Sequence, residues 1–432
     1  MKKMAILFGA LAQLFTFCSC GKNKDINKTM INYVDSLIAA TDSYIPAWNK
    51  ENFKGRWNYI DGVFLNSIVN LYYEYEDIDS VKANKYKDFF INYINYYISS
   101  AGAFINPENG QSGYRANELD SVCESKILFD AYEMTKDERY LNAIDFTYAN
   151  LIYMPKCSGT NNYWHKATYQ NQIWLDGMYM YAPFYARYAK ANNKPEIFDE
   201  LKEQYEYIRN NMFDEDKKLY YHGHDSTKSV FWSDSKTGCS KSFWLRSIGW
   251  YIVSLTDVIE YFPESDNKEY LKGLLAEALD GVLQYQDSKT MMFYQVVDLG
   301  KKKVRVKAGY FETLKNKAYM VDGKYVDRDV ENYLESSGSS MIAYALSKAS
   351  RLGYVSKDYR EIGLKTFEGI YNNSFSKNEL KNICITAGLG TNDDIFKDGS
   401  HSYYLAERVG SNDAKGVGPF IMAYLEYRKA GV

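Results

Sequence analysis

Two aspartates lie at matching places in two apolar segments. Asp176 stands in "QIWLDGMYM" and Asp120 in "NELDSV". In the first turn of a helix, either carboxylate could simply satisfy free backbone amides. Two such carboxylates close together, beside aromatic rings, raise each other's proton affinity, and one then stays protonated near neutral pH. The pair therefore favours acid catalysis. Asp61 in "YIDGVF" is a weaker candidate, because helix packing explains a "DG" pair equally well.

Other polar and aromatic side chains would surround these carboxylates. His165 and His222 belong to long segments between predicted helices, which favours contact with a substrate over a role in capping or in the core. Arg246 lies in the apolar stretch "SFWLRSIGWY" and requires an anionic partner, either a carboxylate of the site or the substrate. Trp244 and Trp250 are six residues apart, so one can stack on a sugar while the other packs.

Helices of two kinds must position these residues. One kind is amphipathic, as in "PEIFDELKEQYEYIRNNM", and the other is apolar nearly all round, as in "QIWLDGMYMYAPFYARY". The two kinds alternate strictly, six of each. The amphipathic helices are expected at 27–44, 80–100, 137–154, 195–212, 266–286 and 356–374, and the buried helices at 57–75, 119–134, 171–190, 242–261, 333–352 and 413–430.

Six helical hairpins that bury their apolar helices against one another form an (α/α)6 barrel, which predicts an all-α fold with one domain over residues 27–432. The connections into the buried helices are long and emerge on one face, together with the positive ends of six helix dipoles. That face suits an anionic sugar such as a uronate. A small β-hairpin insertion is expected near 293–330, around "DGK".

The composition narrows the possible partners. A net charge of −3 gives no reason to expect nucleic acid as a partner. With 16% aromatic residues the chain is rich in rings that stack on sugars, although compositional drift explains this equally well. Four histidines and no CxxC pair predict neither a metal site nor a cofactor. A monomer or weak homo-oligomer is expected.

The first residues differ from the rest. Lys2 and Lys3 precede an apolar run that ends in "CSCG", as in a secretory signal. Cys20 after small Ser19 is similar to a bacterial lipoprotein cleavage site. We therefore expect a signal peptide at 1–19, lipidation of Cys20, a short tether at 20–26, and a lipid anchor in the bacterial cell envelope, facing the periplasm or the outer membrane.

Several blocks resemble a known family. "WHKATYQNQIWLDGMYM", "FWLRSIGWY", "ENYLESSGSSMIAYAL" and "DGSHSYYLAERVGSNDAKGVGPFIMAYLEY" are similar to the unsaturated rhamnogalacturonyl hydrolases of glycoside hydrolase family 105. The resemblance implies an (α/α)6 barrel. It also implies an exo-acting hydrolase that removes a 4,5-unsaturated uronic acid from oligosaccharides made by polysaccharide lyases.

The resemblance also assigns roles. It implies that Asp176 protonates C4 of the unsaturated sugar and accepts a proton from the water that attacks C5, while Asp120 helps to bind the substrate. The residues that it places around the sugar are Tyr59, His165, Trp174, His222, Trp244, Arg246 and Trp250.

Some positions depart from the family pattern. His224 stands where tryptophan or tyrosine is usual, and Leu245 where glycine is usual. Five basic residues between Lys301 and Lys307 would meet an acidic or sulfated oligosaccharide, or form a solvated strand. Two other functions remain open: a different (α/α)6 carbohydrate enzyme, such as a lyase or a conventional glycosidase, and a glycan-binding lipoprotein without catalytic activity.

Overall fold

The computed structural model describes residues 26–50 and 53–431. The predicted signal peptide and Cys20 lie outside the described residues. Within the described part of the chain, no helix combines the length and the apolar character needed to cross a bilayer.

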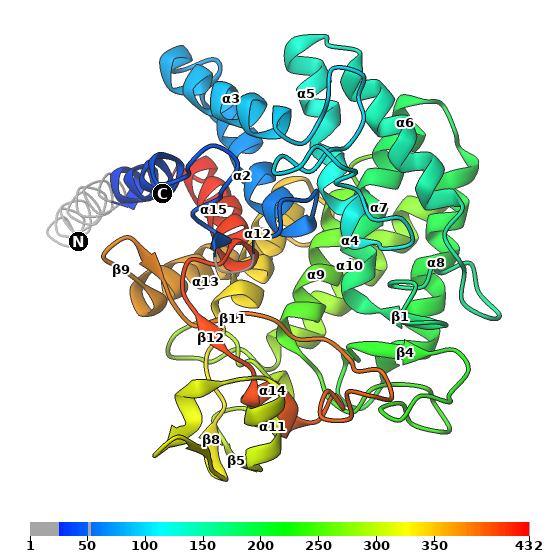
Figure 1. The fold of residues 1–432 in the computed structure, drawn as a ribbon, viewed down its shortest axis with the longest axis vertical. Helices are drawn as coiled ribbons and strands as arrows, with labels where there is room; N and C mark the ends of the chain where they lie inside the picture. Colours follow the sequence, from blue (N-terminus) through cyan, green and yellow to red (C-terminus); the bar gives the residue numbers. More distant parts are fainter. Residues whose placement is uncertain (1–25, 51–52, 432) are drawn as a thin grey trace, which may run out of the picture.

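Six inner helical segments form a closed ring, as predicted (Figure 1). Each contacts the next one along the chain, and the last contacts the first. The segments are α2 (Tyr59–Tyr75), the interrupted α4–η2–α5 (Asp120–Cys123, Glu124–Ile127, Leu128–Thr135), α7 (Leu175–Ala191), α9 (Leu245–Val258), α12 (Ser336–Arg351) and α15 (Ala414–Lys429). The all-α (α/α)6 barrel is therefore confirmed.

The outer helices follow their predicted ranges within a few residues. Their buried residues form one stripe, as in α8, where Ile197, Leu201, Tyr205 and Ile208 face the inner ring. These helices are residues 26–39, α3 (Ser80–Asn95), α6 (Arg139–Ile152), α8 (Glu196–Met212), α10 (Asp266–Leu283) and α13 (Asp358–Ser374).

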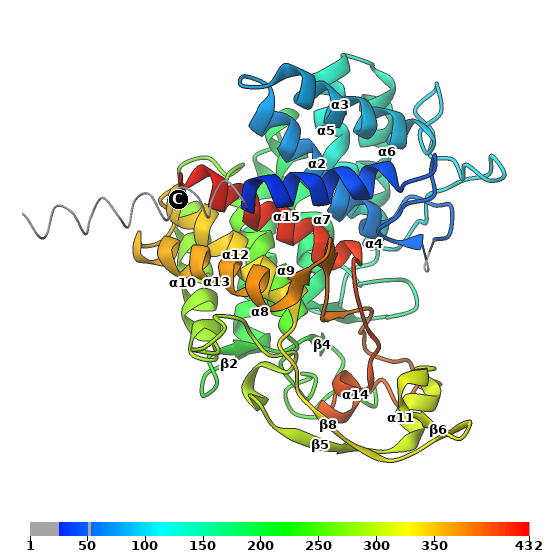
Figure 2. The ribbon, with the colours of Figure 1, turned by 90° about the vertical axis from the view of Figure 1, so that its left-hand side faces the viewer.

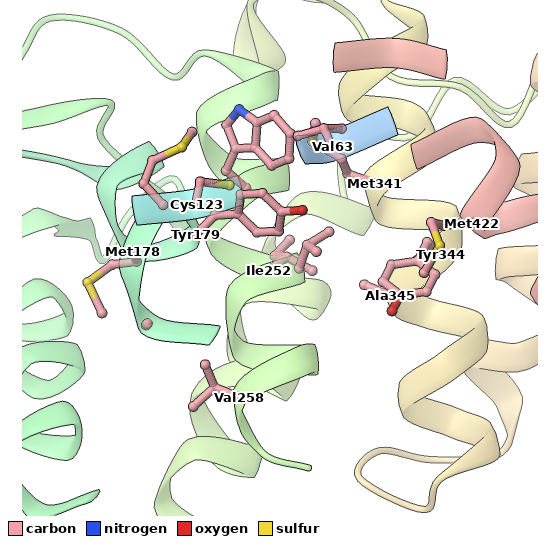
Figure 3. Close-up of a cluster of buried hydrophobic side chains, with 14 of the residues drawn as sticks. Val63, Cys123, Met178, Tyr179, Ile252, Val258, Met341, Tyr344, Ala345 and Met422 are labelled. Atoms are coloured by element: carbon pink, nitrogen blue, oxygen red, sulfur yellow. The ribbon is translucent and has the colours of Figure 1, made fainter. Parts of the chain in front are cut away.

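Small residues near the starts of the inner helices allow these helices to approach closely. A Cβ atom on Gly418 of α15 would lie 2.5 Å from the carbonyl oxygen of Val63 on α2. Deeper in the ring the inner helices share one apolar core. There Tyr179 of α7, Ile252 of α9 and Tyr344 of α12 face one another (Figure 3). Packing on all sides explains why these helices lack a polar face.

The second inner helix is the exception to a regular ring. The sequence predicts an unbroken helix over 119–134, but the 3-10 turn η2 interrupts it. At this turn the buried Glu124 accepts a hydrogen bond from the Asn58 backbone N–H at 2.7 Å. A Cβ on Gly62 would lie 2.7 Å from the Glu124 Cα atom, so η2 packs directly against the start of α2.

A belt of six equivalent backbone hydrogen bonds connects the starts of the inner helices. In each bond, an N–H at or just before an inner helix donates to a carbonyl in the segment that precedes the next inner helix, at 2.8–3.2 Å. The six bonds run from Trp57 to Gly113, Leu119 to His165, Leu175 to His222, Leu245 to Gln295, Ser336 to Asn382, and Ala414 to Trp48. The belt satisfies amides that helix formation leaves free, and it closes the ring.

Short antiparallel strand pairs reinforce the connections at this end of the barrel. The most important for the site is β1 (Gln172–Trp174) with β4 (Gly223–Asp225), because it joins the segments that precede α7 and α9. The other pairs are β2 (Phe213–Asp214) with β3 (Leu219–Tyr220), β9 (Phe375–Ser376) with β10 (Glu379–Leu380), and β11 (Ile383–Cys384) with β12 (Val409–Gly410).

The insertion before α12 is more elaborate than a single hairpin. Strands β5 (Lys303–Val306) and β8 (Arg328–Glu331) pair antiparallel. Between them lie α11 (Ala308–Thr313), the turn η4 (Lys317–Tyr319) and a second hairpin of β6 (Met320–Val321) and β7 (Lys324–Tyr325). The turn η3 (Val297–Leu299) precedes the insertion, and α14 (His401–Ala406) packs on it. In Figure 2 this lobe lies below the barrel, and the C-terminal end of α15 lies on the left.

Candidate active site

Asp176 lies in the first turn of α7, with 8% of its surface exposed. Its Oδ2 atom is 3.3 Å from Nε2 of His222, and the His222 side chain is fully buried. Neither of these two atoms makes a hydrogen bond to a described residue. A buried carboxylate oxygen and a buried imidazole nitrogen thus face each other with unused hydrogen-bonding capacity, which is costly unless a ligand uses it.

The belt and β1 determine this geometry. The carbonyl of His222 accepts the N–H of Leu175, the residue before Asp176. Trp174, the last residue of β1, pairs with Gly223 of β4. Because the backbones on both sides of the contact are joined directly, Asp176 and His222 have little freedom to separate.

Aromatic rings surround the contact. The indole of Trp174 stacks on the imidazole of His165, with ring centroids 4.5 Å apart. Trp244 lies 4.8 Å from the ring of His222. Only 6% of Trp174 and 1% of Trp244 are exposed, so these rings pack within the protein and exclude water from Asp176. The two histidines and the two tryptophans are therefore brought together around Asp176.

Asp120, the first residue of α4, has a cation as its main partner. Lys166 Nζ lies 2.5 Å from Asp120 Oδ2 and 3.1 Å from Glu118 Oε1. Burial by itself would lower the pKa of Lys166, but the two carboxylates raise it above its usual range. The ion pair, and not a second carboxylate, is thus the close electrostatic contact of Asp120, and Lys166 is a site residue that the sequence reasoning did not select.

His165 lies between Asp120 and Trp174. Its Nε2 lies 3.5 Å from Asp120 Oδ1, while its ring stacks on Trp174. Burial, together with the charge of Lys166, lowers the pKa of His165 to about 3. His165 is therefore a neutral imidazole at physiological pH, and its buried Nδ1 makes no hydrogen bond to a described residue.

Arg246 is buried in the first turn of α9 and finds its partners within the protein. Its guanidinium donates to the carbonyl oxygen of Cys384 and to Ser337 Oγ at 3.4 Å, and it lies 4.6 Å from the ring of Trp244. Burial opposes its charge, but surrounding groups, among them Glu335, raise the pKa of Arg246 above its usual range. Arg246 therefore brings a permanent positive charge to the wall of the site.

The other predicted site residues lie in different surroundings. Tyr59 is the first residue of α2. Burial, together with the nearby charge of Asp120, raises the pKa of Tyr59 well above its usual range. Trp250, with 1% exposed, stacks on Tyr179 in the inner core, with centroids 4.3 Å apart. Trp244, the residue before α9, is therefore the tryptophan of this motif whose ring contacts His222.

Tyr404 belongs to the site although the sequence reasoning did not select it. Its hydroxyl is 2.7 Å from Nδ1 of His222, and its ring is stacked with that of Trp244 at a centroid distance of 5.8 Å. Burial and the nearby charge of Asp176 raise the pKa of Tyr404 well above its usual range. Because 182 residues separate Tyr404 from His222, local sequence does not predict their contact. The only sequence signal for Tyr404 is that "SYY" lies in a long connection on the face of the site.

The weaker candidate Asp61 has internal partners. Its carboxylate accepts hydrogen bonds from Trp48 Nε1 at 3.1 Å, Asn58 Nδ2 at 3.0 Å and Tyr93 OH at 3.1 Å. Burial raises the pKa of Asp61 to about 6, although these hydrogen bonds lower it. Asp61 therefore connects the first inner helix to the outer helix α3.

The basic segment 301–307 contains strand β5, which pairs with β8. Lys301 and Lys303 lie 3.7 and 3.9 Å from the carboxylate of Glu331, and Arg305 lies 3.5 Å from Asp329. These exposed pairs give three of the five basic residues partners within the insertion.

Comparisons with known proteins identify the family. The model of Glycosyl Hydrolase Family 88 matches residues 31–314 and 323–430. Protein Atu3128 of Agrobacterium fabrum is 29% identical over 253 residues, which make up 56% of this chain and 96% of that protein.

Solved structures agree with this match. A family 105 glycoside hydrolase from C. acetobutylicum is 32% identical, with a TM-score of 0.75, over 92% of this chain and 99% of the other. A possible family 105 member from Salmonella enterica serovar Paratyphi A, 18% identical with a TM-score of 0.69 over 95% of both chains, has the same fold. The chain therefore belongs to the glycoside hydrolases of family 88, together with their family 105 relatives.

Proposed function

We propose that this glycoside hydrolase removes a 4,5-unsaturated uronic acid, of galacturonyl or glucuronyl type, from the non-reducing end of oligosaccharides produced by polysaccharide lyases. The observation that carries the proposal is the buried Asp176 Oδ2, which faces His222 Nε2 without a hydrogen bond. A carboxyl group so placed can transfer a proton to a bound substrate and take one back.

In the proposed reaction Asp176 acts twice. Its carboxyl group first donates a proton to C4 of the C4=C5 double bond, and positive charge develops at C5 and the ring oxygen. A water molecule then attacks C5, gives one proton to the Asp176 carboxylate and keeps the other in the new hydroxyl group. The resulting hemiketal rearranges and expels the remaining sugar, so one water is consumed and the carboxyl group is regenerated.

The remaining residues bind and orient the substrate. Six inner helices begin at this end of the barrel, and their dipoles favour the carboxylate of a uronate. Arg246 adds a fixed positive charge, and the buried rings of Trp174 and Trp244 keep water away from the catalytic carboxyl group. Asp120, oriented by Lys166, accepts hydrogen bonds from sugar hydroxyl groups.

The test is the loss of the ultraviolet absorbance of the conjugated double bond when lyase-generated disaccharides are supplied. Pectic and glucuronate-derived disaccharides should be compared, because lyases leave the unsaturated uronic acid on a different remaining sugar in each case. We expect Asp176→Asn to lower kcat by about a thousandfold, since the amide cannot donate the same proton. Consumption of none of the disaccharides by the wild type, or unchanged turnover by Asp176→Asn, contradicts the proposal. Tight binding without turnover would indicate a glycan-binding protein instead.

We also propose that the enzyme works in the cell envelope, attached through a lipid on Cys20, as a monomer or weak homo-oligomer. The signal-like residues before Cys20 support this location. An anchored enzyme would meet oligosaccharides close to where lyases release them.

A further inference from the structure

A cavity of about 600 Å³ lies at the other end of the barrel, where the inner helices end. Its volume is within the range of small-molecule sites. Every inner segment contributes to the lining, so the cavity lies on the barrel axis. One lining residue from each is Asn66 of α2, Lys126 of η2, Arg187 of α7, Asp257 of α9, Tyr344 of α12 and Met422 of α15.

Most charged side chains around this cavity have partners within the protein. Arg187 makes two hydrogen bonds to Asp130, at 2.6 and 2.9 Å. Arg351 makes two to Glu426, both at 2.7 Å. Bidentate pairs of this kind neutralise the cations and fix their geometry, so these arginines form the wall of the cavity and leave no charge unbalanced.

Lys126 differs from these cations. Only 6% of its surface is exposed, and its Nζ donates to the hydroxyl of Tyr179 at 2.6 Å while lying 4.0 Å from the centre of that ring. No carboxylate of the described residues lies within ion-pair distance of it. A buried ammonium without an anion is unfavourable, and burial lowers the pKa of Lys126.

The helix dipoles do not explain this lysine. Lys348 and Arg351 lie in the last turn of α12, where cations complement the negative end of a helix. Lys126 lies instead in η2, in the middle of the second inner segment, which continues through α5 to Thr135. Its charge therefore has no partner at a helix end.

Other polar groups line the same cavity. The hydroxyl of Tyr344 donates to Asp257 Oδ1 at 2.7 Å, and Lys348 donates to the same oxygen at 2.9 Å. Met422 lies close to Tyr344 (Figure 3), and Asn66 and Asn70 line the wall. A phenol, amides and a carboxylate around a buried cation that has no ion pair suit a ligand with several hydroxyl groups and one negative charge.

We propose that this cavity is a second ligand site, which binds a small sugar acid with its carboxylate paired to Lys126 and its hydroxyl groups bonded to the polar side chains around it. The inference rests on the cavity and its charges alone, and the proposed reaction at the opposite end of the barrel does not enter it. Occupation would supply Lys126 with the anion that the fold omits.

Isothermal titration of the whole protein with glucuronate and galacturonate tests the proposal. Galactose serves as the matched sugar without a carboxylate, and inorganic phosphate as the anion without a sugar. Lys126→Met keeps the length of the side chain and removes its charge, whereas Asn70→Trp obstructs the cavity and leaves Lys126 in place. Because the proposed active site also favours a uronate, the number of sugar acids bound per protein is measured together with the affinity.

We expect both cavity variants to weaken sugar-acid binding at one site by about tenfold or more. Galactose should bind much more weakly than either acid. Equal binding by the wild type and the cavity variants, in affinity and in number of sites, would overturn the proposal. Tighter binding of phosphate than of both acids would overturn the assignment of a sugar. If Lys126→Met does not fold, Asn70→Trp decides the outcome.

Discussion

At the scale of single residues, the tyrosine behind His222 is the most informative addition to the site. The Tyr404 hydroxyl bonds Nδ1 of His222, and Nε2 of the same ring faces Asp176. One hydrogen bond therefore sets the orientation of the imidazole beside the catalytic carboxylate. Tyr404 is a positioning residue, because it reaches Asp176 only through His222.

Tyr404→Phe removes this bond and keeps the ring. We expect kcat to fall by about tenfold, since a buried hydrogen bond contributes roughly 1 to 1.5 kcal/mol, with a smaller change in KM and a shifted pH profile. Steady-state kinetics on the preferred unsaturated disaccharide measures both constants. Tyr403→Phe is the matched control, because the neighbouring hydroxyl accepts from the backbone of Gly388 and should leave kcat within about twofold. Equal effects of the two changes would contradict the positioning role.

At the scale of elements, the belt of six backbone bonds determines how the inner helices meet. Ala414→Pro tests it, because proline suits the first residue of α15 and Asp413 before it is already extended. The change removes only the N–H that donates to the buried Trp48 carbonyl. We expect the free energy of unfolding to fall by about 1–3 kcal/mol in urea titrations.

Asp266→Pro is the control for the belt. It places proline at the first residue of the outer helix α10, outside the belt, and should change stability by less than about 0.5 kcal/mol. A loss of stability as large as that of Ala414→Pro would show that proline at a helix start, and not the belt, is responsible.

Glu407, the residue directly after α14, should make the stability of the protein depend on pH. Burial raises the pKa of Glu407 to about 7, although a hydrogen bond from Tyr403 lowers it. The folded pKa lies above the ordinary value of 4.5, so protonated Glu407 stabilises the folded state. This stabilisation is present at low pH and is lost as the pH rises towards 7 and above.

Glu407→Gln removes this titration. Relative to the wild type, the variant should gain about 3 kcal/mol in free energy of unfolding between pH 4.5 and pH 8. Urea unfolding of both proteins at the two pH values measures the difference. A difference that does not change with pH would mean that Glu407 titrates normally in the folded protein.

At the scale of the whole molecule, the barrel carries chemistry at one end and the proposed second site at the other, while the anchor would precede the first outer helix. Cys20→Ser should move the protein from the membrane fraction to the soluble fraction, because the lipid is its proposed attachment. Its turnover of unsaturated disaccharides should stay unchanged, because the catalytic residues lie in the barrel. Retention of the variant in the membrane fraction would contradict lipidation at Cys20.

The sequence by itself determined the barrel. Amphipathic segments alternate with segments that are apolar nearly all round, and the second kind can be buried only if every copy has neighbours on both sides. The same periodicity placed Asp120 and Asp176 at the starts of inner helices, on the face with the long connections. These conclusions rest on local spacing, which a single chain displays directly.

Only the tertiary structure decided which side chains meet. Asp120 pairs with Lys166, and His222 contacts Tyr404 from a segment 182 residues away. Trp244 contacts His222 while Trp250 enters the core, although both lie in one short motif. These contacts form when the belt joins each connection to the next hairpin, so they depend on closure of the ring. Closure likewise brings the five other inner segments to the cavity that Lys126 lines.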